Sequence, residues 1–121
     1  MANHQDHAEL IRSLKDPASY RHAVDAVSVI ETHISFILLA GEYAYKIKKP
    51  LNLGFVDFST LEKRLLSCNE EIRLNRRLAP SLYLGVVPVT GTPSRPQMDG
   101  AGPAIEYAVK MRRFSQECMA D

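Results

Sequence analysis

The sequence has only two cysteines, Cys68 and Cys118, and neither belongs to a CxxC pair or to a cysteine–histidine pattern with metal-ligand spacing. This scarcity argues against a cysteine-based metal site and favours a reducing compartment. No secretory signal pattern precedes the two cysteines. We therefore expect a cytoplasmic protein.

Long apolar runs and an excess of charge are missing as well. The longest apolar run, residues 34–40, is far shorter than the roughly 20 residues that a membrane helix needs. Fifteen lysines and arginines balance fourteen acidic residues, for a formal net charge of +1. This balance gives no general attraction to nucleic acid or to an anionic membrane, so any partner has to be inferred from local features.

Five stretches of the chain have the composition of β-strands and are bounded by turn formers. The first three follow one another directly, which predicts an antiparallel meander. Pro88 in the fourth stretch indicates an edge position or a bulge late in that strand. The stretches are "AVSVIETH" (26–33), "ISFILLAG" (34–41), "YAYKIKK" (43–49), "LYLGVVPVTG" (82–91) and "AIEYAVKMRRF" (104–114).

Two further stretches predict helices. Residues 4–15 have apolar residues near helical spacing, with Asp6 as a possible cap, and predict a short helix. The second stretch opens with the capping-box pattern S-x-x-E, in which Ser59 would be the cap, and continues at helical intervals to Ala79. The turn formers of residues 92–103 predict an exposed loop.

These elements together predict an α+β fold in which one long helix packs on a five-stranded antiparallel sheet, with a short N-terminal helix. A chain of 121 residues fits one domain. We expect residues 1–19 to form an N-terminal helical extension and residues 20–121 to form the main domain.

The third strand is unusual because it carries three lysines in four positions. Alternation places Ala44, Lys46 and Lys48 on one face of the strand. The other face carries Tyr43, Tyr45 and Ile47, and we expect it to pack on the long helix. A small residue two positions before a lysine leaves room for a flat ring beside a group that binds phosphate.

The order of these elements, with "YAYK" and "EEIRLNRRL", resembles the N-terminal lobe of protein-kinase-like phosphotransferases, most closely the aminoglycoside phosphotransferase and choline kinase branch. Residues 20–121 also look like the N-terminal part of uncharacterised bacterial proteins in which a kinase-like region precedes a P-loop ATP-binding domain. The resemblance implies a half-site for ATP. It also implies two partners within a longer protein, a C-terminal kinase lobe and a P-loop ATPase domain.

The resemblance assigns roles to individual residues. Lys46 would bind phosphate, Ala44 would cover the adenine, and Glu71 would be the helix partner of Lys46, with Glu70 as the alternative. Lys48 and Lys49 are expected to face solvent or to attract anions.

Two further segments complete the site that the resemblance implies. The turn "ETHIS" would lie over the phosphates, and because it has no glycine, Thr32 and Ser35 would supply hydroxyl or backbone donors. Residues 109–112 would form the hinge that bonds to adenine. Met111 is our candidate from this segment, although the residue that faces the ring stays open.

The residues after Pro80 contain no H-x-D-x-x-x-x-N pattern and no later metal-binding aspartate. Phosphoryl transfer needs such groups to accept a proton and to hold Mg²⁺. We therefore expect the chain to bind nucleotide but to be an incomplete and inactive catalyst by itself, with Mg²⁺ bound only in the presence of the second lobe.

The alternative is a non-enzymatic binding module. Nine of the fifteen lysines and arginines lie in three short stretches, three in each of "KIKK", "RLNRR" and "KMRR". Such a basic surface would meet nucleic acid or a neighbouring ATPase domain. Binding of nucleic acid is the less favoured outcome, because no aromatic–glycine RNA signature or reading helix accompanies the charges.

Overall fold

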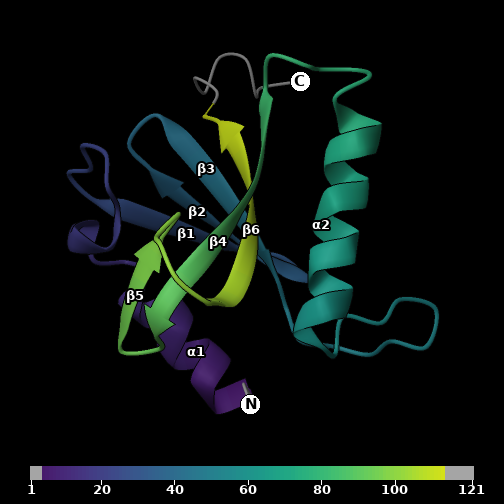
Figure 1. Cartoon of the computed structure of the whole chain (residues 1–121), viewed down its shortest axis with the longest axis horizontal. Coiled ribbons are helices and arrows are strands. Elements are labelled where there is room, and N and C mark those ends of the chain that lie inside the picture. The colour runs from purple at the N-terminus through teal and green to yellow at the C-terminus, as the bar shows by residue number, and fades with distance from the viewer. Residues whose placement is uncertain (1–3, 114–121) are drawn as a thin grey trace.

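The computed structural model describes residues 4–113, and for its first two residues it describes the backbone only. Six strands form one strongly twisted antiparallel sheet, with a helix packed at each side (Figure 1). The helices are α1 (His4–Ser13), the 3₁₀ turn η1 (Pro17–Ser19) and α2 (Leu61–Asn75). The strands are β1 (Val27–Glu31), β2 (Ser35–Ala40), β3 (Tyr43–Lys48), β4 (Tyr83–Thr92), β5 (Arg95–Met98) and β6 (Ala104–Arg112).

The strand order in the sheet is β1-β2-β3-β6-β4-β5, and every neighbouring pair is antiparallel. The predicted meander is confirmed for β1, β2 and β3. The last strand, β6, lies between β3 and β4 and joins the two halves of the sheet. The α+β class and the long packed helix are also confirmed. The predicted strand 104–114 ends at Arg112 in the sheet, and its residue 114 lies outside the described part of the chain.

The prediction of five strands is wrong, because the expected loop 92–103 contains the sixth strand. β5 pairs with the end of β4 through a tight turn, from Thr92 opposite Arg95 to Val89 opposite Met98. Pro96 does not prevent this pairing, since β5 is an edge strand and one side of it needs no ladder partner. A register shift between Val89 and Thr90 follows Pro88 directly, as the proline indicated.

The long helix α2 begins one residue later than predicted. Thr60, not Ser59, has the extended backbone of an N-cap, and its hydroxyl accepts a hydrogen bond from the N–H of Lys63 at 3.2 Å. The regular helix ends at Asn75, four residues before the predicted end at Ala79. A turn at residues 76–78 follows it.

Two apolar clusters hold these layers together. The larger one joins α1 to the sheet, and its members Leu14, Leu38 and Ile47 are completely buried. The residues expected as an N-terminal extension therefore supply part of the core. The smaller cluster lies between α2 and the sheet and contains Cys68, Ile72 and Val109.

The face of β3 that packs on α2 is the opposite of the one predicted. Tyr45 and Ile47 join the α1 cluster, where Leu10 and Ile11 supply the apolar contacts. The face that carries the lysines is therefore turned toward α2. Within residues 4–113, no helix is long and apolar enough to cross a membrane.

Candidate functional site

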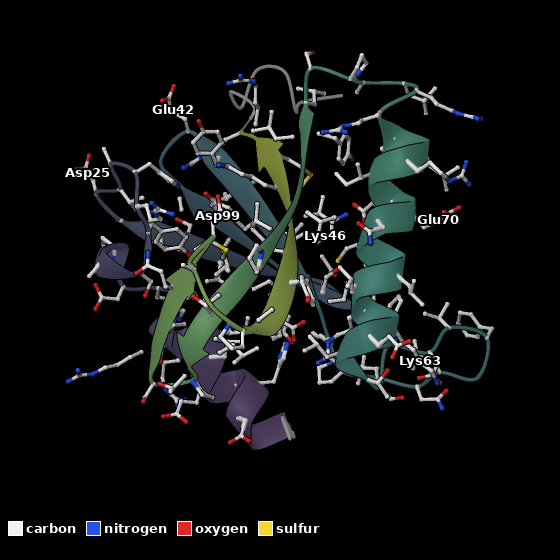
Figure 2. The ribbon with its side chains drawn as sticks, in the orientation of Figure 1. Asp25, Glu42, Lys46, Lys63, Glu70 and Asp99 are labelled. Carbon is white, nitrogen blue, oxygen red and sulfur yellow. The ribbon has the colours of Figure 1, made fainter. Side chains whose placement is uncertain are left out.

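Lys46 and Glu71 meet between the sheet and α2. Lys46 Nζ donates a hydrogen bond to Glu71 Oε2 at 2.8 Å, across 25 residues of sequence. Figure 2 shows Lys46 directed from β3 toward α2, whereas Glu70 points away from the sheet. Glu70 instead pairs with Arg73 on the exposed side of the helix. The geometry thus selects Glu71 over Glu70 as the partner of Lys46.

Lys48 is also part of this site, contrary to the expectation that it faces solvent. Its Nζ donates to Glu71 Oε1 at 2.7 Å, and its side chain is only 7% exposed. The Lys48 ammonium group also lies 5.5 Å from the ring centre of Phe58. The reason for the difference is the orientation of β3, which turns both lysines toward α2. Lys49, by contrast, pairs with the exposed Glu31 at the sheet edge.

The two lysines decide the charge state of Glu71. Burial alone would raise the pKa of the Glu71 carboxyl, but the hydrogen bonds from Lys46 and Lys48 outweigh it and lower that pKa below its ordinary value. Glu71 is therefore ionised at neutral pH. Two cations on one carboxylate leave the cluster with a net charge of +1.

Ala44 and Met111, the two residues expected to contact adenine, are neighbours in the sheet. They are register partners on β3 and β6. Two residues further along β3, Lys46 is the register partner of Val109. Cross-strand partners share a face, so Ala44, Lys46 and Met111 all lie on the α2 side. The expected hinge, residues 109–112, is regular strand in the structure and is paired with β3.

An apolar strip continues this face across β1 and β2. Ile30 and Ile37 are register partners, and Leu39 is opposite Ala44. None of the three belongs to either core cluster of the described residues, and Ile30 is 44% exposed. The main contacts of α2 are with β4 and β6, so within residues 4–113 this helix covers only the other half of the face. The strip is thus a partly open apolar surface beside Lys46.

The turn between β1 and β2 is closed by its own polar groups. The Thr32 N–H donates to the Ser35 carbonyl at 2.8 Å, and the Ser35 N–H donates to Thr32 Oγ1 at 3.0 Å. The two hydroxyl oxygens are 3.2 Å apart. The structure therefore places Thr32 and Ser35 together, near the Lys48 end of β3, with their hydroxyl groups engaged with each other.

A buried charged network near α1 was missed in the sequence. Arg64 Nε donates to both carboxylate oxygens of Glu106, at 3.0 and 3.1 Å, and its Nη1 donates to the Phe58 carbonyl. His7 Nε2 lies 3.3 Å from Glu106, and all three side chains are almost fully buried. The sequence signal for the pair was weak, since Arg64 and Glu106 are 42 residues apart.

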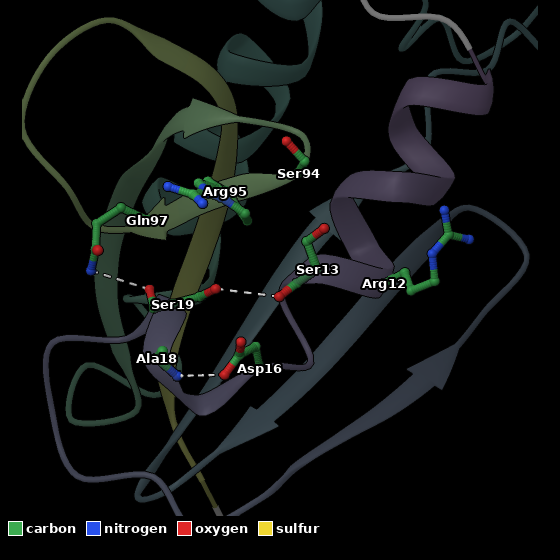
Figure 3. A pocket seen from close by; sticks show the side chains of 9 residues that line it. Arg12, Ser13, Asp16, Ala18, Ser19, Ser94, Arg95 and Gln97 are labelled. Carbon is green, nitrogen blue, oxygen red and sulfur yellow. Dashed lines mark hydrogen bonds between the residues drawn. The ribbon is translucent and has the colours of Figure 1, made fainter.

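The described part of the chain has other hollows away from Lys46. The pocket in Figure 3 has a volume of about 490 Å³ and lies between α1, η1 and β5. Some of its polar groups bond to one another, as Gln97 Nε2 does to the Ser19 carbonyl and the Ser19 hydroxyl does to the Ser13 carbonyl. No group of three or more histidine, cysteine or acidic side chains within the described residues is arranged to hold a metal ion.

Comparison with known proteins finds relatives whose function is not described. Uncharacterised proteins of Mycobacterium bovis and Mycobacterium tuberculosis are each 40% identical to this chain over 88 residues. The match includes 73% of this chain but only 16% of each relative, so the chain spans about a sixth of their length. No protein-family model and no solved structure matches the chain.

Proposed function

We propose that this chain is the ATP-binding lobe of a kinase-like phosphotransferase of the aminoglycoside phosphotransferase and choline kinase type. The observation that carries the proposal is the ion pair between Lys46 and Glu71, on the face where Ala44 comes two residues earlier. A partly exposed ion pair of this kind contributes only about 0–1 kcal/mol to stability, so stability explains its presence poorly. A helix carboxylate that orients a lysine beside a small residue is suited to hold the phosphates of a nucleotide.

The surroundings of Lys46 fit the proposed ligand. The partly open strip of Ile30, Ile37 and Leu39 adjoins Ala44, and a flat apolar base requires such a surface. We assign the adenine contacts to Ala44 and Met111 and the phosphate contact to Lys46. Thr32 and Ser35 are proposed to hold the shape of the turn over the phosphates, because their hydroxyl groups are already engaged.

Catalysis is proposed to need other parts of a longer protein. The described residues show no cluster of metal ligands, so we assign the Mg²⁺ ligands and the proton acceptor to a C-terminal lobe. The length of the mycobacterial relatives leaves room for such a lobe and for a P-loop ATPase domain. We propose the cytoplasm, where ATP is available, as the location.

The test is an NMR titration of the isotopically labelled chain with a non-hydrolysable ATP analogue. Because the proposed C-terminal lobe would form the other half of the cleft, we expect this chain to bind the analogue weakly. The chemical-shift changes should centre on the backbone amides of Ala44, Lys46 and Met111. Lys46→Ala should lower the affinity about tenfold, which is the loss expected for one charge-assisted hydrogen bond. Lys63→Ala is the matched control, since Lys63 pairs with Asp57 at a distance from this face.

Stability gives the second arm of this test. Lys46 is 25% exposed and Glu71 keeps Lys48 as a partner, so Lys46→Ala should change the free energy of unfolding by no more than about 1 kcal/mol. If urea denaturation shows that Lys46→Ala lowers the free energy of unfolding by several kcal/mol, Lys46 is a structural charge. Shifts confined to other surfaces, or none, would overturn the proposed nucleotide site.

A further inference from the structure

A small pocket lies on the face of the sheet that is turned away from Lys46. Tyr45 on β3 and Lys110 on β6 are register partners next to the pair of Lys46 with Val109, so they share the opposite face. Figure 2 shows Asp99, the residue after β5, on that side of the sheet, while Lys46 points toward α2. The pocket has a volume of about 200 Å³. Pockets for drug-sized ligands begin at roughly 300 Å³, so a ligand of this pocket has to be small.

Three aromatic rings form one wall of this pocket. A hydrogen bond of 2.8 Å joins His22 Nε2 and the Tyr45 hydroxyl group. The His22 ring stacks on the Tyr45 ring with an interplanar angle of 14°, and its centre lies 4.9 Å from that of the Tyr43 ring in an edge-to-face contact. Burial raises the pKa of the Tyr45 hydroxyl and the nearby Asp99 carboxylate raises it further, so this hydroxyl is neutral at pH 7. The wall is thus in place without a ligand.

The pocket also carries opposite charges that do not pair with each other. Lys110 Nζ lies over the Tyr43 ring, 4.2 Å from its centre. The Asp99 carboxylate lines the same pocket. Within residues 4–113, neither Lys110 nor Asp99 forms an ion pair of 4.0 Å or less. An ammonium group and a carboxylate are therefore neighbours in one small pocket, each without a charged partner in the described chain.

The backbone around Asp99 fixes the position from which its carboxylate extends. The Asp99 N–H donates to the Pro88 carbonyl at 2.8 Å, and the Asp99 carbonyl accepts from Arg21 Nη1 at 3.3 Å. The φ of Asp99 is 57°, in the left-handed region that aspartate and asparagine adopt more readily than other non-glycine residues. Arg21 also lines the pocket and adds a second cation to it.

We propose that this pocket binds a small zwitterion of the α-amino acid type, with the ligand carboxylate at Lys110 and the ligand ammonium group at Asp99. A simple anion would leave Asp99 without a counter-charge, and a simple cation would compete with Lys110 for the Tyr43 ring. A ligand with both charges gives each group a charge-assisted hydrogen bond. The pocket uses neither Lys46 nor Glu71, so this inference is independent of the proposed nucleotide site.

The test is an NMR titration of the isotopically labelled chain with glycine, acetate and methylammonium. Glycine has the two charges in one molecule, and the other two probes have one charge each. We expect glycine to bind with the millimolar affinity that so small a ligand can reach, and to shift the backbone amides of Tyr43, Asp99 and Lys110. Acetate and methylammonium should each bind about tenfold more weakly, because each lacks one charge-assisted hydrogen bond.

Two substitutions separate the two ends of the ligand. Lys110→Met keeps an unbranched side chain over Tyr43 without the charge, and it should weaken glycine and acetate about tenfold each. Asp99→Asn is tolerated at positive φ and should weaken glycine about tenfold, whereas acetate should bind more tightly because a like charge is removed. Lys63→Met is the control, since Lys63 pairs with Asp57 outside this pocket, and it should change neither affinity.

The parent chain alone can overturn the proposal, so the test does not depend on how well a variant folds. If acetate or methylammonium binds as tightly as glycine, the pocket recognises a single charge and the zwitterion is the wrong ligand. If glycine shifts no amides, or only amides outside the pocket, the proposed site is wrong. If Asp99→Asn weakens glycine and acetate equally, Asp99 does not contact the ammonium group and the proposed orientation fails.

Discussion

At the scale of single residues, the most demanding interaction is the buried pair between Arg64 and Glu106. Arg64 belongs to α2 and Glu106 to β6, so their two hydrogen bonds attach the first turns of the helix to the centre of the sheet. The Nε–H group is shared between the two carboxylate oxygens, and the same guanidinium also reaches the Phe58 carbonyl through Nη1. The helix that carries Glu71 is thus held by a second ion pair, two turns before Glu71.

We expect Arg64→Met to be strongly destabilising. The substitution leaves the Glu106 carboxylate buried without its main partner, and breaking a buried pair in this way costs about 3–5 kcal/mol. Domains of this size have a total stability of about 5–15 kcal/mol, so the loss would be a large part of it. Urea denaturation monitored by circular dichroism measures it.

Arg73→Met is the control for Arg64→Met on the same helix. Arg73 pairs with Glu70, and both side chains are more than half exposed, so its loss should leave the denaturation midpoint unchanged. If the two substitutions lower the free energy of unfolding equally, burial does not strengthen the pair of Arg64 with Glu106.

The sequence predicted part of this candidate site. Strand alternation placed Lys46 on one face of its strand, and the resemblance to kinase-like lobes gave Glu71, with Glu70 as the alternative, as its partner on the following helix. The sequence did not indicate that Lys48 is buried or that Arg64 pairs with Glu106. Burial depends on which elements cover a face, and a pair 42 residues apart leaves no local periodicity to detect.

At the scale of elements, β5 is the strand that was not predicted from the sequence. Its segment is rich in turn formers, and those residues make the hairpin with β4 instead of a loop. Gly91 stands opposite Pro96 with a φ of 90°, a conformation that suits glycine. A Cβ at this position would lie within 2.4 Å of the Arg95 carbonyl oxygen. Tight turns of this kind are difficult to tell from open loops by composition alone.

Gly91→Ala should therefore weaken the hairpin, and Gly54→Ala is a matched control. Gly54 has a similar φ of 87°, but a Cβ there meets no atom within 4 Å. Both substitutions carry the strain of positive φ, about 1–2 kcal/mol. Only Gly91→Ala adds the collision with backbone, so its loss in the free energy of unfolding should be clearly larger. Equal losses would mean that the hairpin between β4 and β5 is not as closely packed as described.

At the scale of the whole molecule, the arrangement of charge bears on the alternative function, a basic surface that binds nucleic acid. Five of the nine cations in the three basic stretches form ion pairs or hydrogen bonds within the described structure. Lys46 and Lys48 bind Glu71, Lys49 and Arg73 pair with acidic side chains, and Arg76 donates to the carbonyls of residues 83 and 84. The remaining four are Arg77, Arg112, Arg113 and Lys110, whose ammonium group lies 4.2 Å from the ring centre of Tyr43. The basic surface is thus smaller than the sequence indicated.

This arrangement predicts weak, shallow salt-dependent binding to nucleic acid. The logarithm of the affinity for duplex DNA falls with the logarithm of salt by about 0.9 for each phosphate that is neutralised. Four available cations give a slope no steeper than about −4, whereas all nine would give about −8. Fluorescence anisotropy with a labelled duplex at several salt concentrations measures the slope. A slope near −8 would require the ion pairs of Lys46, Lys48 and Lys49 to open for DNA, and it would favour the non-enzymatic binding module over the nucleotide-binding lobe.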